Sequence, residues 1–70
     1  NNINKTMKKF EIVSSKMYDF YTKYIIKHNN KLYICNYNGG LPKLQGKTLT
    51  ESQSYYLSET IEDYFLSYIK

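Results

Sequence analysis

The sequence is short of the residue types that build most catalytic and cross-linked sites: among 70 residues it has one cysteine, one histidine, one proline and no arginine. A single cysteine, Cys35, excludes a disulfide within the chain and favours a reducing compartment. A single histidine, His28, provides too few ligands for a metal site or a Cys–His nucleophile, so we expect a surface residue of a turn. The lack of arginine counts against sequence-specific DNA binding, which relies on the arginine fork to read guanine.

Long apolar runs are also missing. Lysine interrupts every apolar stretch well before the roughly 18 residues that a membrane helix needs. We therefore expect a cytoplasmic protein with neither a spanning segment nor a signal peptide. Residues 1–70 are expected to form one small domain, whose core is small enough for its stability to be marginal.

The abundant residues point to the source of the chain. Lys, Asn, Ile, Tyr and Phe make up 36 of the 70 residues, while alanine and arginine are absent. Because the favoured residues have A/T-rich codons, we expect an AT-rich genome. A short reading frame of this kind is typical of an accessory protein of a phage or mobile element.

The first part of the chain has apolar residues three and four positions apart, the spacing of one helix face. They are Ile3, Met7, Phe10, Val13, Met17, Phe20, Tyr21 and Tyr24. We predict a helix from about Asn4 to about Tyr18–Tyr21, followed by a strand that runs to Asn29-Asn30. The alternative is a continuous helix to Lys27, in which case Lys31–Tyr37 pairs with Leu41–Gln45.

The segment Lys31–Tyr37 is the clearest strand, since β-branched and aromatic residues lie there between turn formers. Asn29-Asn30 predicts a tight turn of the primed type, because asparagine tolerates positive φ. That turn sets an apolar register, in which Ile26 faces Tyr33, Tyr24 faces Cys35, and Ile25 faces Ile34. Beyond the Asn38-Gly39-Gly40 turn, Leu41–Gln45 is predicted to be a short edge strand, limited to the edge by Pro42.

Thr48 and Glu51 match a capping box and predict a helix from Leu49 to about Ile69. The predicted core stripe of this helix consists of Leu57, Ile61, Tyr64 and Tyr68, with Tyr56 and Phe65 at its margins. Tyr55 and Leu66 fall on the solvent-facing side of this helix. The predicted fold is α+β: an N-terminal helix, a central antiparallel hairpin or three-stranded sheet, and a C-terminal helix.

No motif indicates catalysis. Gly46-Lys47-Thr48 looks like the end of a phosphate-binding loop, but the first glycine that this motif requires is Leu41 here. Glu59 and Asp63 lie one helical turn apart, as expected for a solvated helix face. We therefore predict a protein that is not an enzyme and has no cofactor and no metal site.

Positive charge is concentrated in the first half. Residues 1–31 contain seven lysines and two acidic residues, whereas residues 32–70 contain three lysines and four acidic residues. On a continuous N-terminal helix, five lysines would form a ridge opposite the apolar stripe: Lys5, Lys9, Lys16, Lys23 and Lys27. Such a ridge suits phosphates or an acidic protein surface, and Tyr18, Tyr33 or Tyr37 could stack on bases.

The sequence thus predicts function by binding. Nine tyrosines exceed what so small a core encloses, and tyrosine gives contact area at low entropic cost. The first hypothesis is an accessory protein that docks on a larger host protein and modulates or inhibits it. The alternatives are a nucleic-acid-binding module that uses the lysine-rich surface, and a purely structural subunit. A homodimer through Tyr55, Leu66 and an unpaired sheet edge is also expected.

Overall fold

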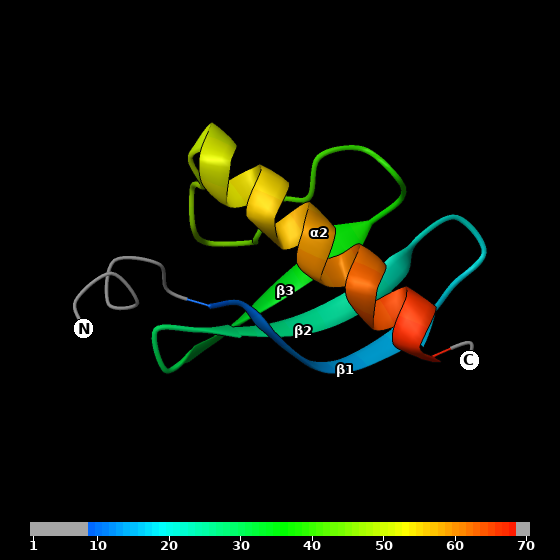
Figure 1. The fold of residues 1–70 in the computed structure, drawn as a ribbon. Helices are drawn as coiled ribbons and strands as arrows, with labels where there is room; N and C mark the ends of the chain where they lie inside the picture. Colours follow the sequence, from blue (N-terminus) through cyan, green and yellow to red (C-terminus); the bar gives the residue numbers. More distant parts are fainter. Residues whose placement is uncertain (1–8, 69–70) are drawn as a thin grey trace.

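The computed structural model describes residues 9–68 (Figure 1). Three antiparallel strands form one sheet in the order β1-β2-β3: β1 spans Glu11–Met17, β2 spans Thr22–His28 and β3 spans Lys31–Tyr37. The helix α2, Glu51–Tyr68, lies across one face of the sheet. No described element covers the other face. The α+β class is therefore confirmed, with a three-stranded sheet and one helix in two layers.

The β2–β3 hairpin agrees with its prediction. Asn29 and Asn30 both have positive φ, 56° and 63°, as a two-residue primed turn requires. The paired residues are those expected from the sequence: Ile26 with Tyr33, Tyr24 with Cys35, and Ile25 with Ile34. The turn and the burial of one face specify the same register, because a shift by one residue would move the apolar side chains to the wrong face.

The predicted N-terminal helix is wrong. Glu11–Met17 is strand β1, which pairs with β2, and a turn follows it before Thr22. The register shifts between Ile12 and Ser14, where a β-bulge interrupts the alternation of faces. Because the bulge breaks the two-residue alternation typical of a strand, the apolar residues of this segment have a spacing typical of a helix instead. Val13 and Met17, assigned to the apolar stripe, are 52% and 78% exposed.

The same finding excludes the continuous helix to Lys27, since β2 occupies Thr22–His28. The start of the predicted helix, residues 4–8, lies outside the described residues. The third strand of the sheet therefore comes from the segment before the hairpin rather than from the segment after it.

Leu41–Gln45 is not an edge strand. Only an isolated bridge joins Leu44 to Lys47, and the Gln45 N–H donates to the Ile34 carbonyl at 2.9 Å. Pro42 and Leu44 are buried, so the segment packs against the core. It covers part of the β3 edge as a loop, because Pro42 cannot donate to a ladder.

Helix α2 begins two residues later than predicted, with a different cap. The Gln53 N–H donates to Thr50 Oγ1 at 3.1 Å, and the Thr50 N–H donates to Gln53 Oε1 at 2.9 Å. This is a reciprocal capping box. It uses Thr50 and Gln53 instead of Thr48 and Glu51, because the same spacing of residue types recurs two positions along.

The core lies between α2 and the inner face of the sheet. Its buried apolar members are Phe10, Tyr24, Ile26, Cys35, Leu44, Leu57 and Ile61. The predicted helix stripe is therefore present in Leu57 and Ile61, with Tyr64 and Tyr56 half-buried, whereas Phe65 is exposed. The side chain of Tyr68 lies outside the described part of the chain.

His28 is not the exposed turn residue that the sequence suggested. It is the last residue of β2 and only 2% exposed. Its ring stacks on Phe10 at 4.2 Å between centroids, and its Nδ1 lies 3.1 Å from the Lys9 carbonyl oxygen. Alternation along β2 explains this position, since Tyr24, Ile26 and His28 all point toward α2.

Within residues 9–68, no helix has the length and hydropathy to cross a membrane.

Candidate functional site

The turn between β1 and β2 presents a fully displayed aromatic side chain. Phe20 is 88% exposed at this turn. The Tyr18 N–H donates to the Tyr21 carbonyl at 2.8 Å, and the two tyrosine rings stack at 4.9 Å between centroids with planes 19° apart. The turn is thus closed by its backbone and braced by its side chains, which holds Phe20 outward.

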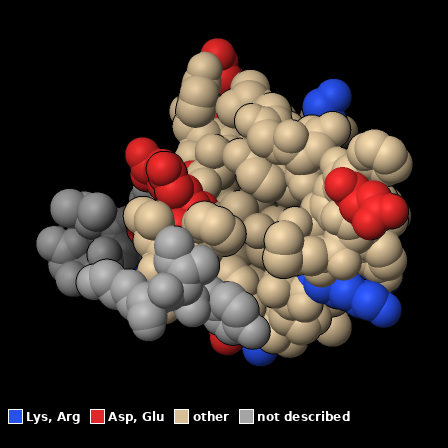
Figure 2. All heavy atoms as spheres, turned by 90° about the vertical axis from the view of Figure 1, so that its right-hand side faces the viewer, with Lys and Arg blue, Asp and Glu red and all other residues tan. Residues whose placement is uncertain are grey.

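Other apolar side chains gather at the same end of the molecule. The aromatic end, as we name it, consists of Met17, Tyr18, Phe20, Tyr21 and Phe65, all exposed. A depression of about 380 Å³ separates the turn from the last turns of α2; its lining includes Tyr21, Tyr37, Ile61 and Phe65. Figure 2 looks onto this end and shows mainly uncharged atoms in the centre, with charged groups toward the margins.

A cluster of tyrosines packs beneath the aromatic end. The Tyr24 ring lies 6.2 Å from Tyr64 in an edge-on arrangement and 6.4 Å from Tyr37. The Tyr64 hydroxyl lies 3.3 Å from Ser15 Oγ, which links α2 to β1. Burial raises the pKa of the Tyr24 phenol, and the nearby Cys35, Tyr37 and Tyr64 add to this effect. The Tyr24 phenol is therefore neutral at physiological pH.

The second candidate surface is the uncovered face of the sheet. Residues that point away from α2 place Lys16 on β1 directly opposite Lys23 on β2, while Lys27 pairs with Glu11. The ammonium of Lys16 lies 5.4 Å above the centre of the Tyr18 ring. Apolar residues share this outer sheet face: Ile25, Leu32 and Ile34. The face is therefore both basic and apolar.

The lysine ridge of the sequence analysis is only partly assembled. Lys16, Lys23 and Lys27 share the outer sheet face, but Lys9 lies at the start of the described chain, at the opposite end of β1 from Lys16. Lys5 lies outside the described residues. Of the tyrosines proposed for stacking, only Tyr18 is beside these lysines. Tyr33 and Tyr37 are half-buried on the inner face, packed against the core.

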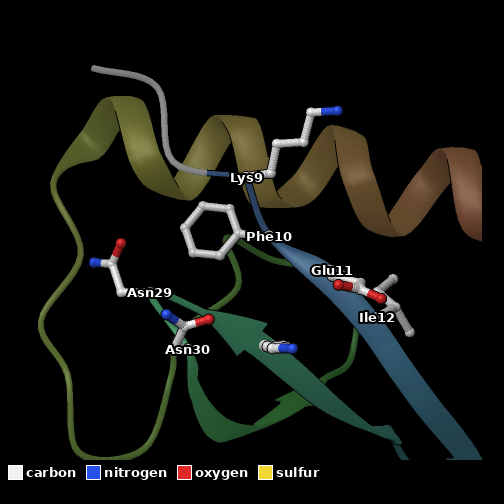
Figure 3. A pocket seen from close by; sticks show the side chains of 7 residues that line it. Lys9, Phe10, Glu11, Ile12, Asn29 and Asn30 are labelled. Atoms are coloured by element: carbon white, nitrogen blue, oxygen red, sulfur yellow. The ribbon is translucent and has the colours of Figure 1, made fainter. Parts of the chain in front are cut away.

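Another hollow lies at the other end of the sheet (Figure 3). It measures about 960 Å³ and is lined by Lys9, Phe10, Glu11, Ile12, Lys27, Asn29 and Asn30. Its polar side chains diverge rather than meet: Lys9 and Glu11 point away from the two asparagines. This arrangement provides no convergent set of groups for chemistry on a ligand.

Cys35 and His28 are both buried. Cys35 is fully buried, and burial raises the pKa of its thiol, although a backbone hydrogen bond from Lys43 offsets part of this. His28 is held against Phe10. No group of three potential metal ligands occurs within residues 9–68.

The outward side of α2 is the third candidate surface. Tyr55 and Leu66 are 54% and 50% exposed, which agrees with their predicted place on the wet side of the helix. Glu59 and Glu62 lie between them and are also exposed. The interface role proposed for Tyr55 and Leu66 stays a prediction.

The aromatic end was missed by the sequence analysis. It depends on the turn between β1 and β2, whose Tyr18 and Tyr21 line the same depression as Phe65 of α2. A local signal for the turn was present in Tyr18-Asp19-Phe20-Tyr21, because aspartate favours turns and Asp19 is followed by two exposed aromatic residues.

Comparison with protein-family models, curated proteins and solved structures found no match for this chain.

Proposed function

We propose that this protein is a non-enzymatic binding module that docks on a larger protein through its aromatic end and modulates that protein. The observation that carries the proposal is the display of Phe20: a phenylalanine 88% exposed at the tip of a turn closed by the Tyr18–Tyr21 hydrogen bond and ring stack. An exposed aromatic patch of this kind marks an interaction surface.

The turn suits tight binding because it is already ordered. Immobilising a flexible side chain or loop costs free energy on association, and here the stacked Tyr18 and Tyr21 rings hold the turn before binding. Aromatic anchors that fill a pocket dominate the energetics of many interfaces. The expected partner therefore has an apolar pocket for Phe20, with polar groups at its rim for the two tyrosine hydroxyls.

The test compares Phe20→Ser with Val13→Ser. Val13 is also an exposed apolar side chain, 52% accessible, and lies on β1 outside the aromatic end. The partner is first captured from a nuclease-treated extract with a photo-crosslinking amino acid at position 20, then produced in pure form for titration. We expect Phe20→Ser to weaken binding by about 2 kcal/mol, roughly thirtyfold in Kd.

Val13→Ser should bind as the unmodified chain does, and both variants should keep the same circular dichroism spectrum, since neither residue is in the core. Equal affinities of the two variants for the captured protein would rule out the aromatic end as the docking surface. Capture from an untreated extract but not from the nuclease-treated one would point to nucleic acid as the ligand.

A further inference from the structure

The two layers of the molecule carry opposite charge on their outward faces. Helix α2 contains four acidic residues and no lysine between Glu51 and Tyr68. The outer sheet face has Lys16, Lys23 and Lys27 against the single acid Glu11. A surface of each sign is therefore available on opposite sides of the same small domain.

The outward stripe of α2 combines acid and apolar groups. Tyr55, Glu59, Glu62 and Leu66 recur four, three and four residues apart, which places them within about 60° around the axis at about 100° per residue. All four are exposed. The buried residues Leu57 and Ile61 lie on the opposite side of the helix. The stripe is thus an apolar-acidic surface with no partner among the described elements.

The outer sheet face has the complementary composition. Ile25 and Ile34 are cross-strand neighbours at its centre, and Leu32 is 64% exposed beside them. Lys16 and Lys23 face each other directly across β1 and β2, an arrangement of like charges that is unfavourable unless an anion lies between them. Lys27 has Glu11 opposite, so the unbalanced positive charge is concentrated at Lys16 and Lys23.

The lengths of the two surfaces are also compatible. The stripe from Tyr55 to Leu66 is about 16 Å long at about 1.5 Å per residue, and each seven-residue strand extends for about 20 Å. The fold itself shows that the sheet accommodates one helix of this length, because α2 already covers the inner face (Figure 1). The outer face consists of the same three strands and therefore has the same length.

We propose that the outer sheet face binds the outward stripe of α2 from a second copy of the chain. Glu59 and Glu62 of one copy then lie against Lys16 and Lys23 of the next, and Tyr55 and Leu66 pack on Ile25, Leu32 and Ile34. Each copy contributes two different faces on opposite sides, so the contact is head-to-tail and builds a row or a closed ring instead of a symmetric pair.

A second copy fits this face better than nucleic acid does. Single-stranded nucleic acid is held by aromatic platforms beside basic groups, yet Tyr33 and Tyr37 are packed on the inner side and Tyr18 alone flanks the lysines. The centre of the face is aliphatic. This inference does not use Phe20, so it stands or falls independently of the proposed docking function.

The test is sedimentation velocity of the purified chain over a range of concentrations. We expect the mean mass to rise with concentration beyond that of a dimer, and to fall in about 1 M NaCl, where the Debye length is only about 3 Å. The paired variants Lys16→Glu/Lys23→Glu and Glu59→Lys/Glu62→Lys should each weaken association by about tenfold or more.

Charge exchange distinguishes a direct contact from a general charge effect. The chain carrying all four reversals should associate again, as should an equimolar mixture of the two paired variants. Lys31→Glu/Lys43→Glu has the same charge change as the first variant at exposed positions outside the outer sheet face and should associate normally. Should a reversal prevent folding, Lys16→Gln/Lys23→Gln replaces it.

Three outcomes would overturn the proposal: a monomer at every concentration, a dimer indifferent to both paired variants, or a quadruple variant that fails to recover. A wild-type monomer that binds an oligonucleotide through Lys16 and Lys23 would assign the face to nucleic acid instead. The Phe20→Ser variant should associate as the unmodified chain does.

Discussion

His28 and Phe10 stack with their ring centres 4.2 Å apart and their planes 20° from parallel, although the sequence placed one in a surface turn and the other in a helix. The contact joins the end of β2 to the residue just before β1. A hydrogen bond from His28 Nδ1 to the Lys9 carbonyl, 3.1 Å long, adds to it.

We therefore expect His28→Ala to lower the free energy of unfolding by about 2–3 kcal/mol, through the cavity beside Phe10 and the unsatisfied carbonyl. Urea denaturation measures this directly. His28→Leu restores most of the volume without the hydrogen bond and should recover part of the loss. A midpoint for His28→Ala equal to that of the unmodified protein would show that the stack contributes little.

The helix cap gives a matched pair of substitutions. Thr50→Ala removes the hydroxyl that accepts the Gln53 N–H and should cost about 1 kcal/mol. Thr48→Ala, chemically the same change two residues earlier, should stay within about 0.5 kcal/mol, as exposed substitutions usually do. Thermal or urea denaturation of the two variants side by side decides the position of the cap, and a larger loss for Thr48→Ala would contradict it.

The Asn29-Asn30 turn should respond to the conformational freedom of its residues. Both have positive φ, which costs a side chain with a branched Cβ about 1–2 kcal/mol. Asn30→Gly creates the preferred Asn-Gly pair for this turn and should raise the unfolding midpoint, whereas Asn30→Val should lower it. Asn36→Val, on regular strand β3, is the control for side-chain size and should not lower the unfolding midpoint as Asn30→Val does.

Stability should decline at alkaline pH. Burial raises the pKa of both the Cys35 thiol and the Tyr24 phenol above their ordinary values of 9.0 and 10.0. The folded protein then binds these protons more tightly than the unfolded chain does, so the stabilisation is complete below the ordinary values and is lost as pH rises through the folded ones. Urea midpoints measured from pH 7 upward should begin to fall as the pH reaches the ordinary thiol value of 9.0.

A thiol reagent provides the control for this interpretation. Cys35 is fully buried, so it should react slowly in buffer and rapidly in denaturant. Fast labelling of the folded protein near neutral pH would mean that the thiol is accessible and that its pKa does not report burial.

The parts of the fold that were predicted correctly depend on local chemistry. Asn29-Asn30 identifies the turn that joins β2 to β3, and the period of Leu57 and Ile61 identifies the buried side of α2. Strand β1 was mistaken for a helix because the bulge between Ile12 and Ser14 breaks its alternation, and because only pairing with β2 defines it as a strand.

The candidate surfaces differ in the same way. Tyr55 and Leu66 could be placed on the outside of α2 because a single helical period fixes them. The turn that carries Phe20 could not be assigned to a surface with Phe65, since the depression shared by Tyr21 and Phe65 follows from the tertiary arrangement of β1, β2 and α2. Lys16 and Lys23 share one ridge only on the alternative, continuous helix, whereas the structure places them opposite each other across β1 and β2.

The bulge in β1 has a consequence for aggregation. The chain is rich in Asn, Ile and Tyr, residues that stack readily in cross-β fibrils, and a flat strand at a sheet edge would template such growth. Between Ile12 and Ser14 the irregular register twists the β1 edge away from a straight ladder. At the other edge the Gln45 N–H already occupies the Ile34 carbonyl. We therefore expect both edges to resist strand-by-strand elongation into amyloid.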